Sequence, residues 1–275
     1  MTLTPPDYHI HTILCKHAAG EMEEYVERAI SSGFREIGFA DHMPVMPEPQ
    51  FCMDWDELPK YLKKTRSLQE KYRGNIAIRL GCEMDMVPGG EDAARDIIDG
   101  SGFDYVIGSV HYLDGWPFDQ EKYRNIFDRN DLKGIYTRFF DAVRRAAETG
   151  LYDIAGHIDN IKRMGYRLSG DMSEYYERTA AVFRDMGLTV ELNTSGLDTA
   201  AQEAYPSLGF LRTLNRFDVP VTLGSDAHRP EQVGRYFDHA VNMLREAGYD
   251  RVAHFNERKR SLAPLPVVQG GGGER

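Results

Sequence analysis

Three histidines stand close together near the start of the chain, in the stretch "DYHIHTILCKH" at residues 7–17. Side chains at positions i and i+2 of a β-strand point the same way, so His9 and His11 would project together toward one centre. The stretch "SDAH" repeats this spacing near the other end of the chain, with Asp226 and His228. Imidazole and carboxylate groups that converge in this way are ligands for divalent metal ions.

Further residues of these two types lie at or near the ends of other predicted strands. The complete set of candidate metal ligands is His9, His11, His17, His42, Glu83, His111, His157, Asp226 and His228. It contains seven of the nine histidines in the chain. One tetrahedral ion takes four ligands, so this set is too large for a single ion and implies two or three. Because no thiolate is included, the donors suit Zn²⁺, Fe²⁺ or Mn²⁺.

The alternative for each histidine alone is a hydrogen-bonded core position, which is the commoner role of a strand-end imidazole. Seven imidazoles at one rim without metal would cost desolvation and, below neutral pH, mutual repulsion, so the cluster as a whole favours metal. Glu83 could bridge two cations or form a salt bridge inside the fold. Glu191 could support a ligand from behind or be structural. His239 and His254 lie in or beyond the last predicted helix and are interpreted as surface residues.

Short apolar runs alternate with longer amphipathic stretches, a pattern typical of βα units around a parallel sheet. The predicted strands are residues 7–11, 36–42, 76–85, 105–111, 153–159, 189–195 and 220–228. The predicted helices are residues 21–33, 56–74, 131–150, 171–187 and 231–248, with a weaker one at 89–100. Several of them end in Gly, which suits a left-handed residue after the last turn. Residues 43–59, rich in Pro and Met, are interpreted as a long loop.

Seven βα repeats close more naturally into a barrel than into an open, doubly wound sheet, which is the alternative. We expect one α/β domain over residues 1–265 and a disordered tail over 266–275, which is rich in Gly. The carboxyl ends of barrel strands form the rim on which active sites are built, and closure makes the first and seventh strands neighbours. On the first strand, Asp7 is expected below the histidines, and Tyr8 and Ile10 are expected to face the helices.

The composition limits the class of protein. The net charge of −10 opposes binding to nucleic acid, which draws on clustered Lys and Arg. No apolar run is long enough to cross a bilayer. Met1 is not followed by the basic and then apolar residues of a secretory signal, so we expect a cytoplasmic protein. Cys15, Cys52 and Cys82 are far apart and lack CxxC spacing, which favours reduced structural thiols over disulfides or metal ligands.

The ordered motifs "HIHT" with His17, "FADHMP", "GCEMD", "IGSVH", "AGHID", "ELNTSGL" and "GSDAH" resemble the polymerase-and-histidinol-phosphatase (PHP) superfamily over residues 7–260. Within it, "SVHYLDGWPFD" and the later "YPS" resemble the monofunctional histidinol-phosphate phosphatases more than the polymerase-associated nucleases. The resemblance implies a distorted (β/α)₇ TIM-like barrel with three divalent metal ions. The implied ligands are His9, His11, Glu83 and Asp226 for one ion, Glu83, His111 and His157 for a second, and His17, His42 and His228 for a third.

The activity implied by the resemblance is hydrolysis of L-histidinol phosphate to L-histidinol and phosphate, a step of histidine biosynthesis. A hydroxide held between two ions would attack phosphorus without a phosphoenzyme, since no P-loop or nucleophile-elbow motif is present. Asp226 and His228 are the candidate catalytic residues. Asp226 could hold the attacking water and take its proton, or be a plain ligand. The leaving alcohol would need a proton from a carboxylic acid or imidazole near the rim.

Trp116 and Asp119, after the fourth predicted strand, could receive an imidazole ring and a protonated amine, although loop aromatics are also routine hydrophobic anchors. Asp198 follows "NTSGL", where the resemblance favours a basic residue. Lys162 and Arg163 are therefore the candidate phosphate contacts, or else a solvated basic pair.

Two other functions remain open. One is hydrolysis of another small phosphomonoester, such as a nucleotide or sugar phosphate, and the other is a non-catalytic metal-binding module. The expected partner is a small phosphomonoester, with no nucleic acid and no membrane, and the sequence carries no prediction of the oligomeric state.

Overall fold

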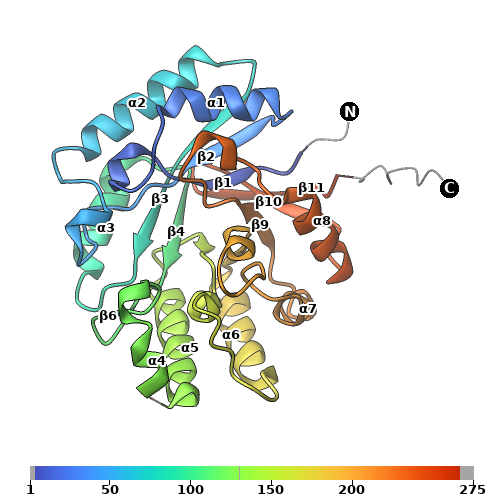
Figure 1. The fold of residues 1–275 in the computed structure, drawn as a ribbon. Helices are drawn as coiled ribbons and strands as arrows, with labels where there is room; N and C mark the ends of the chain where they lie inside the picture. Colours follow the sequence, from blue (N-terminus) through green and yellow to red (C-terminus); the bar gives the residue numbers. More distant parts are fainter. Residues whose placement is uncertain (1–3, 130, 267–275) are drawn as a thin grey trace.

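The computed structural model describes residues 4–129 and 131–266 (Figure 1). Its strands close into a parallel barrel in the order β1-β2-β3-β4-β7-β8-β9. These strands are β1 (Asp7–Ile10), β2 (Glu36–Phe39), β3 (Ala77–Asp85), β4 (Tyr105–Ser109), β7 (Ile154–Ala155), β8 (Thr189–Asn193) and β9 (Val221–Gly224). The prediction of a single α/β barrel domain is confirmed, and the doubly wound sheet is excluded.

Helices surround the strands on the outside of the barrel (Figure 1). They are α1 (Met22–Ser31), α2 (Leu58–Lys71), α3 (Glu91–Ser101), α4 (Asn125–Arg129), α5 (Leu132–Glu148), α6 (Ser173–Met186), α7 (Leu208–Arg216) and α8 (Phe237–Glu246). Short 3₁₀ turns lie at Ile13–Cys15, Pro49–Phe51, Glu121–Tyr123, Asn160–Lys162, Ser195–Asp198 and Pro230–Gln232. The six predicted helices are all present, while α4 and α7 were not predicted. Helix α8 begins later than expected because Tyr236 before it is left-handed, with φ 60°.

The two ends of the chain meet where the barrel closes. Asp7 of β1 pairs with Leu223 of β9, and Ile10 makes an isolated parallel bridge to Ala227. The stretch with His9 and His11 therefore lies beside the stretch with Asp226 and His228, as barrel closure requires.

Strand β1 does not alternate as predicted, because its register with β2 shifts between Asp7 and Ile10. Tyr8 packs in a buried cluster with Tyr105 and Phe255 rather than against the helices, so that expectation was wrong. Asp7 does not lie simply below the histidines: its carboxylate accepts hydrogen bonds from Ser225 Oγ at 2.6 Å and from the Gly234 amide at 2.9 Å. Ile10 does join the core beneath the helices.

A hairpin of β10 (Arg251–Asn256) and β11 (Lys259–Pro264), which was not predicted, supplies Phe255 to this cluster at the amino end of the barrel. Tyr105 fills the interior there, and its hydroxyl donates to the Tyr8 carbonyl at 2.6 Å. A Cβ at Gly38 or Gly81 would lie 2.2 Å from Tyr105 atoms, so only glycine fits these positions on β2 and β3. Side chains thus fill the amino end of the barrel, and the carboxyl end remains open for an active site.

A second small hairpin, β5 (Tyr112–Leu113) with β6 (Trp116–Pro117), follows β4. Among the described helices, none is both long and apolar enough to span a membrane. The predicted tail at 266–275 lies outside the described residues except for Pro266.

Candidate metal centre

A cavity of about 350 Å³ opens at the carboxyl ends of the barrel strands. It is lined by His17, His42, Glu83, His111, Asp119, His157, Asn160, Arg163, Ser195, Asp198, Thr199, Tyr205, Asp226, His228, Gln232 and Arg235. His9 and His11 lie just beneath, fully buried. The larger hollow at the opposite end of the barrel, about 610 Å³, is lined by none of the predicted ligands. Donor chemistry rather than volume therefore marks the candidate site.

The carboxylate of Glu83 on β3 stands at the centre of the histidine cluster. Its Oε2 lies near three imidazoles, 3.1 Å from His9 Nε2, 3.4 Å from His11 Nε2 and 3.2 Å from His42 Nδ1. Its Oε1 faces two others, 2.9 Å from His157 Nε2 and 3.7 Å from His111 Nε2. One carboxylate thus presents its two oxygens to two groups of nitrogen donors, which is the arrangement that a residue shared by two cations requires.

Asp226 joins the same cluster from the loop after β9. Its Oδ1 lies 3.3 Å from His11 Nε2 and 3.5 Å from His228 Nδ1. Asp226 and His157 have positive φ angles, 53° and 24°, which non-glycine residues rarely adopt. Backbone strain of this kind is typical of functional sites, where the surroundings hold a residue in an unfavourable conformation.

The outermost histidines, His17 and His228, approach each other to 2.8 Å between their Nε2 atoms. The rings of His17 and His42 are 5.8 Å apart, so the three residues of the third implied ligand set share one side of the cavity. His11 stacks on His228 with 4.2 Å between ring centroids.

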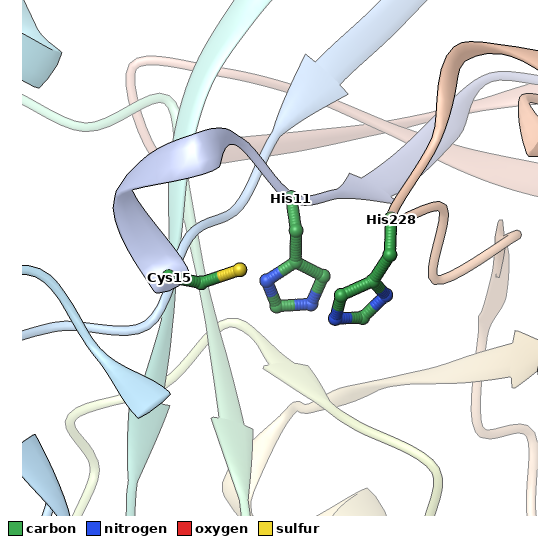
Figure 2. A group of neighbouring side chains, drawn as sticks. All are labelled: His11, Cys15 and His228. Atoms are coloured by element: carbon green, nitrogen blue, oxygen red, sulfur yellow. The ribbon is translucent and has the colours of Figure 1, made fainter. Parts of the chain in front are cut away.

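Cys15 lies closer to this cluster than the sequence indicated. Figure 2 shows its sulfur pointing toward the ring of His11, with His228 beyond that ring. Donor atoms of these three residues lie within 4.8 Å of one another. All three cysteines are buried and unbonded to each other, as predicted for reduced thiols. Burial raises the pKa of the Cys15 thiol, which favours the neutral form that its structural interpretation requires.

Three buried carboxylates stand behind the imidazoles. Glu191 lies 2.6 Å from Nδ1 of His9, and Asp85 lies 2.7 Å from Nδ1 of His111. Asp41 lies 3.4 Å from Nδ1 of His11 and also accepts a hydrogen bond from Thr12. A carboxylate behind a ligating histidine fixes which nitrogen carries the proton and orients the ring.

Asp41 and Asp85 were not identified from the sequence. The signal was present, because Asp85 follows Glu83 at the i+2 spacing of a strand and Asp41 directly precedes His42.

The pKa shifts of the clustered side chains favour the binding of cations. Burial raises the pKa of Glu83, but neighbouring imidazoles, chiefly those of His42 and His9, hold it well below 4.5. Burial lowers the pKa of His9, but the carboxylates of Glu191 and Glu83 outweigh burial and raise it well above 6.5. Burial together with nearby histidines lowers the pKa of His17 to about 4. Ionised carboxylates and a neutral outer imidazole are ready ligands, and cation binding would displace the second proton of His9, the one on Nε2.

Whether the residues fit a metal ion can be tested on buried polar atoms of the cluster that have no hydrogen-bond partner among the described residues. They include His9 Nε2, His42 Nδ1, His157 Nδ1 and Asp85 Oδ2. Buried polar atoms are nearly always hydrogen-bonded. Several unpartnered donor atoms in one cluster therefore suggest that a ligand, such as a metal ion, binds there. Nitrogen and oxygen donors without thiolate suit Zn²⁺, Fe²⁺ or Mn²⁺, and the residues present fit these ions.

The four candidate substrate-binding residues fall into two groups. Asp119 and Arg163 line the cavity, and the Arg163 guanidinium makes no hydrogen bond or ion pair with the described residues. Lys162 does not line it: its buried ammonium donates to Asp159 Oδ2 at 2.9 Å and Glu203 Oε2 at 2.8 Å. Trp116 is not in the lining either and packs on Phe118 and Phe127.

A second guanidinium that the sequence did not indicate reaches the cavity from the loop before α8. Arg235 pairs with Asp198 at 2.7 Å and donates to the Ser225 carbonyl at 3.1 Å. Asp198, which stands where a basic residue was expected, thus holds a basic residue from another part of the chain. Only the fold brings these two residues together.

Comparison with known proteins gives consistent matches. The family model described as PHP domain matches residues 7–195, and one described as PHP-associated matches residues 211–239. A probable histidinol-phosphatase of Deinococcus radiodurans is 37% identical over 256 residues, which covers 92% of this chain and 97% of the relative. The histidinol-phosphatase of Bacillus subtilis is 26% identical, covering 84% of this chain and 96% of the relative.

Among solved structures, the histidinol phosphate phosphatase of Lactococcus lactis, complexed with zinc, L-histidinol and phosphate, aligns with a TM-score of 0.82. The alignment covers 94% of this chain and all of that chain, at 23% sequence identity, and it shows that the two share a fold.

Proposed function

This chain belongs to the PHP domain family, and on that basis we propose that it hydrolyses L-histidinol phosphate to L-histidinol and phosphate. The function rests on its similarity to histidinol-phosphatases along almost the whole chain. The geometry agrees, because the cavity combines a cluster of candidate metal ligands with an acidic and a basic side chain on its lining.

The observation that carries the proposal is the position of Glu83 among five imidazoles, with unpartnered donor atoms around it. We assign the ligands as the family resemblance divides them, to three divalent ions. His9, His11, Glu83 and Asp226 would hold the first, Glu83, His111 and His157 the second, and His17, His42 and His228 the third. When bound, such ions lower the pKa of water and neutralise phosphate oxygens.

The protein's own groups would orient the substrate around these ions. The Arg163 guanidinium lines the cavity without a partner among the described residues and would pair with the phosphate. Asp119 would pair with the substrate ammonium, because its carboxylate lines the cavity and forms no ion pair with the described residues. Asp226 would accept the proton of the attacking water, because it lies at the edge of the cluster and lines the cavity. Lys162 and Trp116 would act through packing instead.

A nucleophilic side chain is not needed for this reaction. Ser195 lines the cavity, but its hydroxyl donates to Asp226 Oδ2 at 3.1 Å, within the candidate ligand cluster. We therefore assign Ser195 to orienting Asp226 rather than to a covalent intermediate. The cytoplasmic location and the lack of nucleic-acid or membrane partners remain predictions.

A panel of phosphomonoesters tests the substrate. Protein reconstituted with Zn²⁺, Fe²⁺ or Mn²⁺ should show a kcat/KM for L-histidinol phosphate well above those for nucleotide and sugar phosphates. Equal values on unrelated esters would support a general phosphoesterase instead. If no ester released phosphate with any metal, the protein would be a non-catalytic metal-binding module.

A charge variant makes the panel sharper. Asp119→Asn should raise KM for L-histidinol phosphate but leave KM for a phosphate ester without an amine unchanged, because only the former carries the ammonium. An equal effect on both esters would show that Asp119 does not recognise the amine.

A further inference from the structure

Glu191 on β8 is fully enclosed, with 1% of its surface exposed, and it belongs to none of the ligand sets assigned above. Its carboxylate nevertheless contacts two candidate ligands that come from different strands and belong to different ion positions. Oε1 lies 2.6 Å from Nδ1 of His9, on β1. Oε2 accepts a hydrogen bond of 2.9 Å from the backbone amide of His157, after β7.

The barrel makes specific room for this carboxylate. Gly224, at the end of β9, lies between β8 and β1, and a Cβ there would come 2.0 Å from Glu191 Oε1 and 2.7 Å from the His9 Cβ. No other residue type could stand at this position without displacing one of the two groups. Asn193, two positions along β8, donates to Oε2 at 3.2 Å and fixes the second oxygen.

The contact with His9 decides how that ring presents its nitrogens. A carboxylate can only accept hydrogen bonds, so the short contact assigns a proton to Nδ1 of His9. Nε2 then carries the lone pair once a cation replaces any second proton, and it faces Glu83 at 3.1 Å. Nε2 has no hydrogen-bond partner of its own among the described residues, so its orientation depends on the contact at Nδ1.

The contact with His157 acts on the main chain instead. His157 has φ 24°, a conformation that costs free energy in a non-glycine residue and persists only if its surroundings hold it. The bond from its amide to Glu191 holds it, and the ring then lies with Nε2 2.9 Å from Glu83 Oε1. A single buried side chain therefore constrains one ligand on each side of Glu83.

We propose that Glu191 is a positioning residue that couples the first and second ion positions. The inference rests on the proposed metal centre and adds that these two positions are not independent. Removing the carboxylate releases the His9 ring and the His157 backbone together, so both ions bind more weakly. Asp41 provides the contrast, because among the candidate ligands its carboxylate contacts only His11, which belongs to the first position alone.

The experiment is a metal titration of the complete protein. Metal-stripped wild type, Glu191→Gln, Glu191→Ala and Asp41→Asn are titrated with Co²⁺, followed by d–d absorption and by metal analysis after gel filtration. Wild type should bind three ions per chain. Glu191→Ala should weaken two of these by about 10- to 100-fold each, the usual effect of losing a supporting carboxylate, whereas Asp41→Asn should weaken one.

Two variants of Glu191 are compared, because one removes the carboxylate completely and the other keeps its volume. Gln has one acceptor oxygen, so it can serve His9 or His157 but not both, and Glu191→Gln should weaken at least one position while it retains the volume of Glu. If Glu191→Ala does not fold, Glu191→Gln alone carries the comparison with Asp41→Asn. A Glu191→Gln protein that binds Co²⁺ as tightly as wild type at every position would overturn the inference. A wild type that binds no metal would instead overturn the proposed function.

Discussion

Nε2 of His17 and Nε2 of His228 lie 2.8 Å apart although 211 positions separate the two residues in the chain. Burial is the main reason that the pKa of each imidazole lies below 6.5, at about 4 for His17. Both rings are therefore neutral at pH 7. In each ring Nδ1 donates to a backbone carbonyl, that of Cys15 at 2.7 Å for His17 and that of Asp226 at 3.0 Å for His228, so each Nε2 carries the lone pair. Two lone pairs that converge in this way are best satisfied by one cation, which is why we place the third ion there.

The first prediction follows from that pair. His228→Ala should reduce the metal content by one ion per chain and lower turnover of L-histidinol phosphate by about 100-fold or more, because one set of ligands is broken. Metal analysis of the reconstituted protein and steady-state kinetics check it. His239→Ala, at an exposed position of α8, is the matched control and should leave both values unchanged. A His228→Ala protein with a full metal complement would refute the third ligand set.

The second prediction concerns His157, whose ring lies against Glu83. His157→Ala should lower turnover by about 10³-fold, since the second ion position loses a ligand. Circular dichroism of the metal-free protein should match that of wild type, because the ring contributes to the site rather than to the hydrophobic core. Activity at the wild-type level would contradict the site as assigned.

The third prediction separates two basic residues that are adjacent in sequence. Arg163→Met should raise KM for L-histidinol phosphate by about 10- to 100-fold, the loss of one charge-assisted hydrogen bond, with metal content unchanged. Inhibition by inorganic phosphate should weaken in parallel. If KM and phosphate inhibition stayed at wild-type values, Arg163 would not contact the phosphate.

Lys162→Met is the companion measurement and should behave differently. It would leave the Asp159 carboxylate, only 6% exposed, without its ammonium partner. The free energy of unfolding should fall by about 3 kcal/mol in urea titrations, as expected for breaking a buried ion pair. Folded Lys162→Met protein should keep the wild-type KM. A raised KM of Lys162→Met would show that Lys162 contributes to substrate binding after all.

The fourth prediction concerns the opposite end of the barrel. Burial raises the pKa of Glu36, but hydrogen bonds from His254, Arg79 and Tyr8 outweigh burial and lower it to about 2. A carboxyl whose pKa is lowered on folding contributes stability above its unfolded pKa of 4.5, and this contribution is lost as pH falls toward 2. Glu36→Gln should therefore cost about 3 kcal/mol at pH 7 and progressively less below pH 4.5.

Urea unfolding of wild type and Glu36→Gln between pH 7 and pH 3.5 measures this difference. Glu246→Gln removes an exposed ion pair with Arg212 and should change little at any of these pH values. A Glu36→Gln effect that stays constant with pH would show that the stability arises from packing and not from the ionised carboxyl.

Much of the fold could be predicted from the sequence because its signals are local. The alternation of short apolar runs with amphipathic stretches identified the seven strands of the barrel and most of its helices. The hairpin β10–β11 was missed because its exposed, polar second strand lacks an apolar pattern. The side-chain directions of Asp7 and Tyr8 were wrong because an irregularity in β1 interrupts the period of two.

The candidate ligands were also proposed from the sequence, since each is an imidazole or carboxylate at or near the end of a predicted strand, and barrel topology gathers strand ends at one rim. The contacts that support these ligands, and those between other residues of the cavity, were decided by the tertiary structure. Glu191 and His9 are 182 positions apart, and Asp198 and Arg235 are 37 apart. Spacing along a chain specifies which side chains share a face of one element, whereas contacts between elements depend on how the closed barrel packs them.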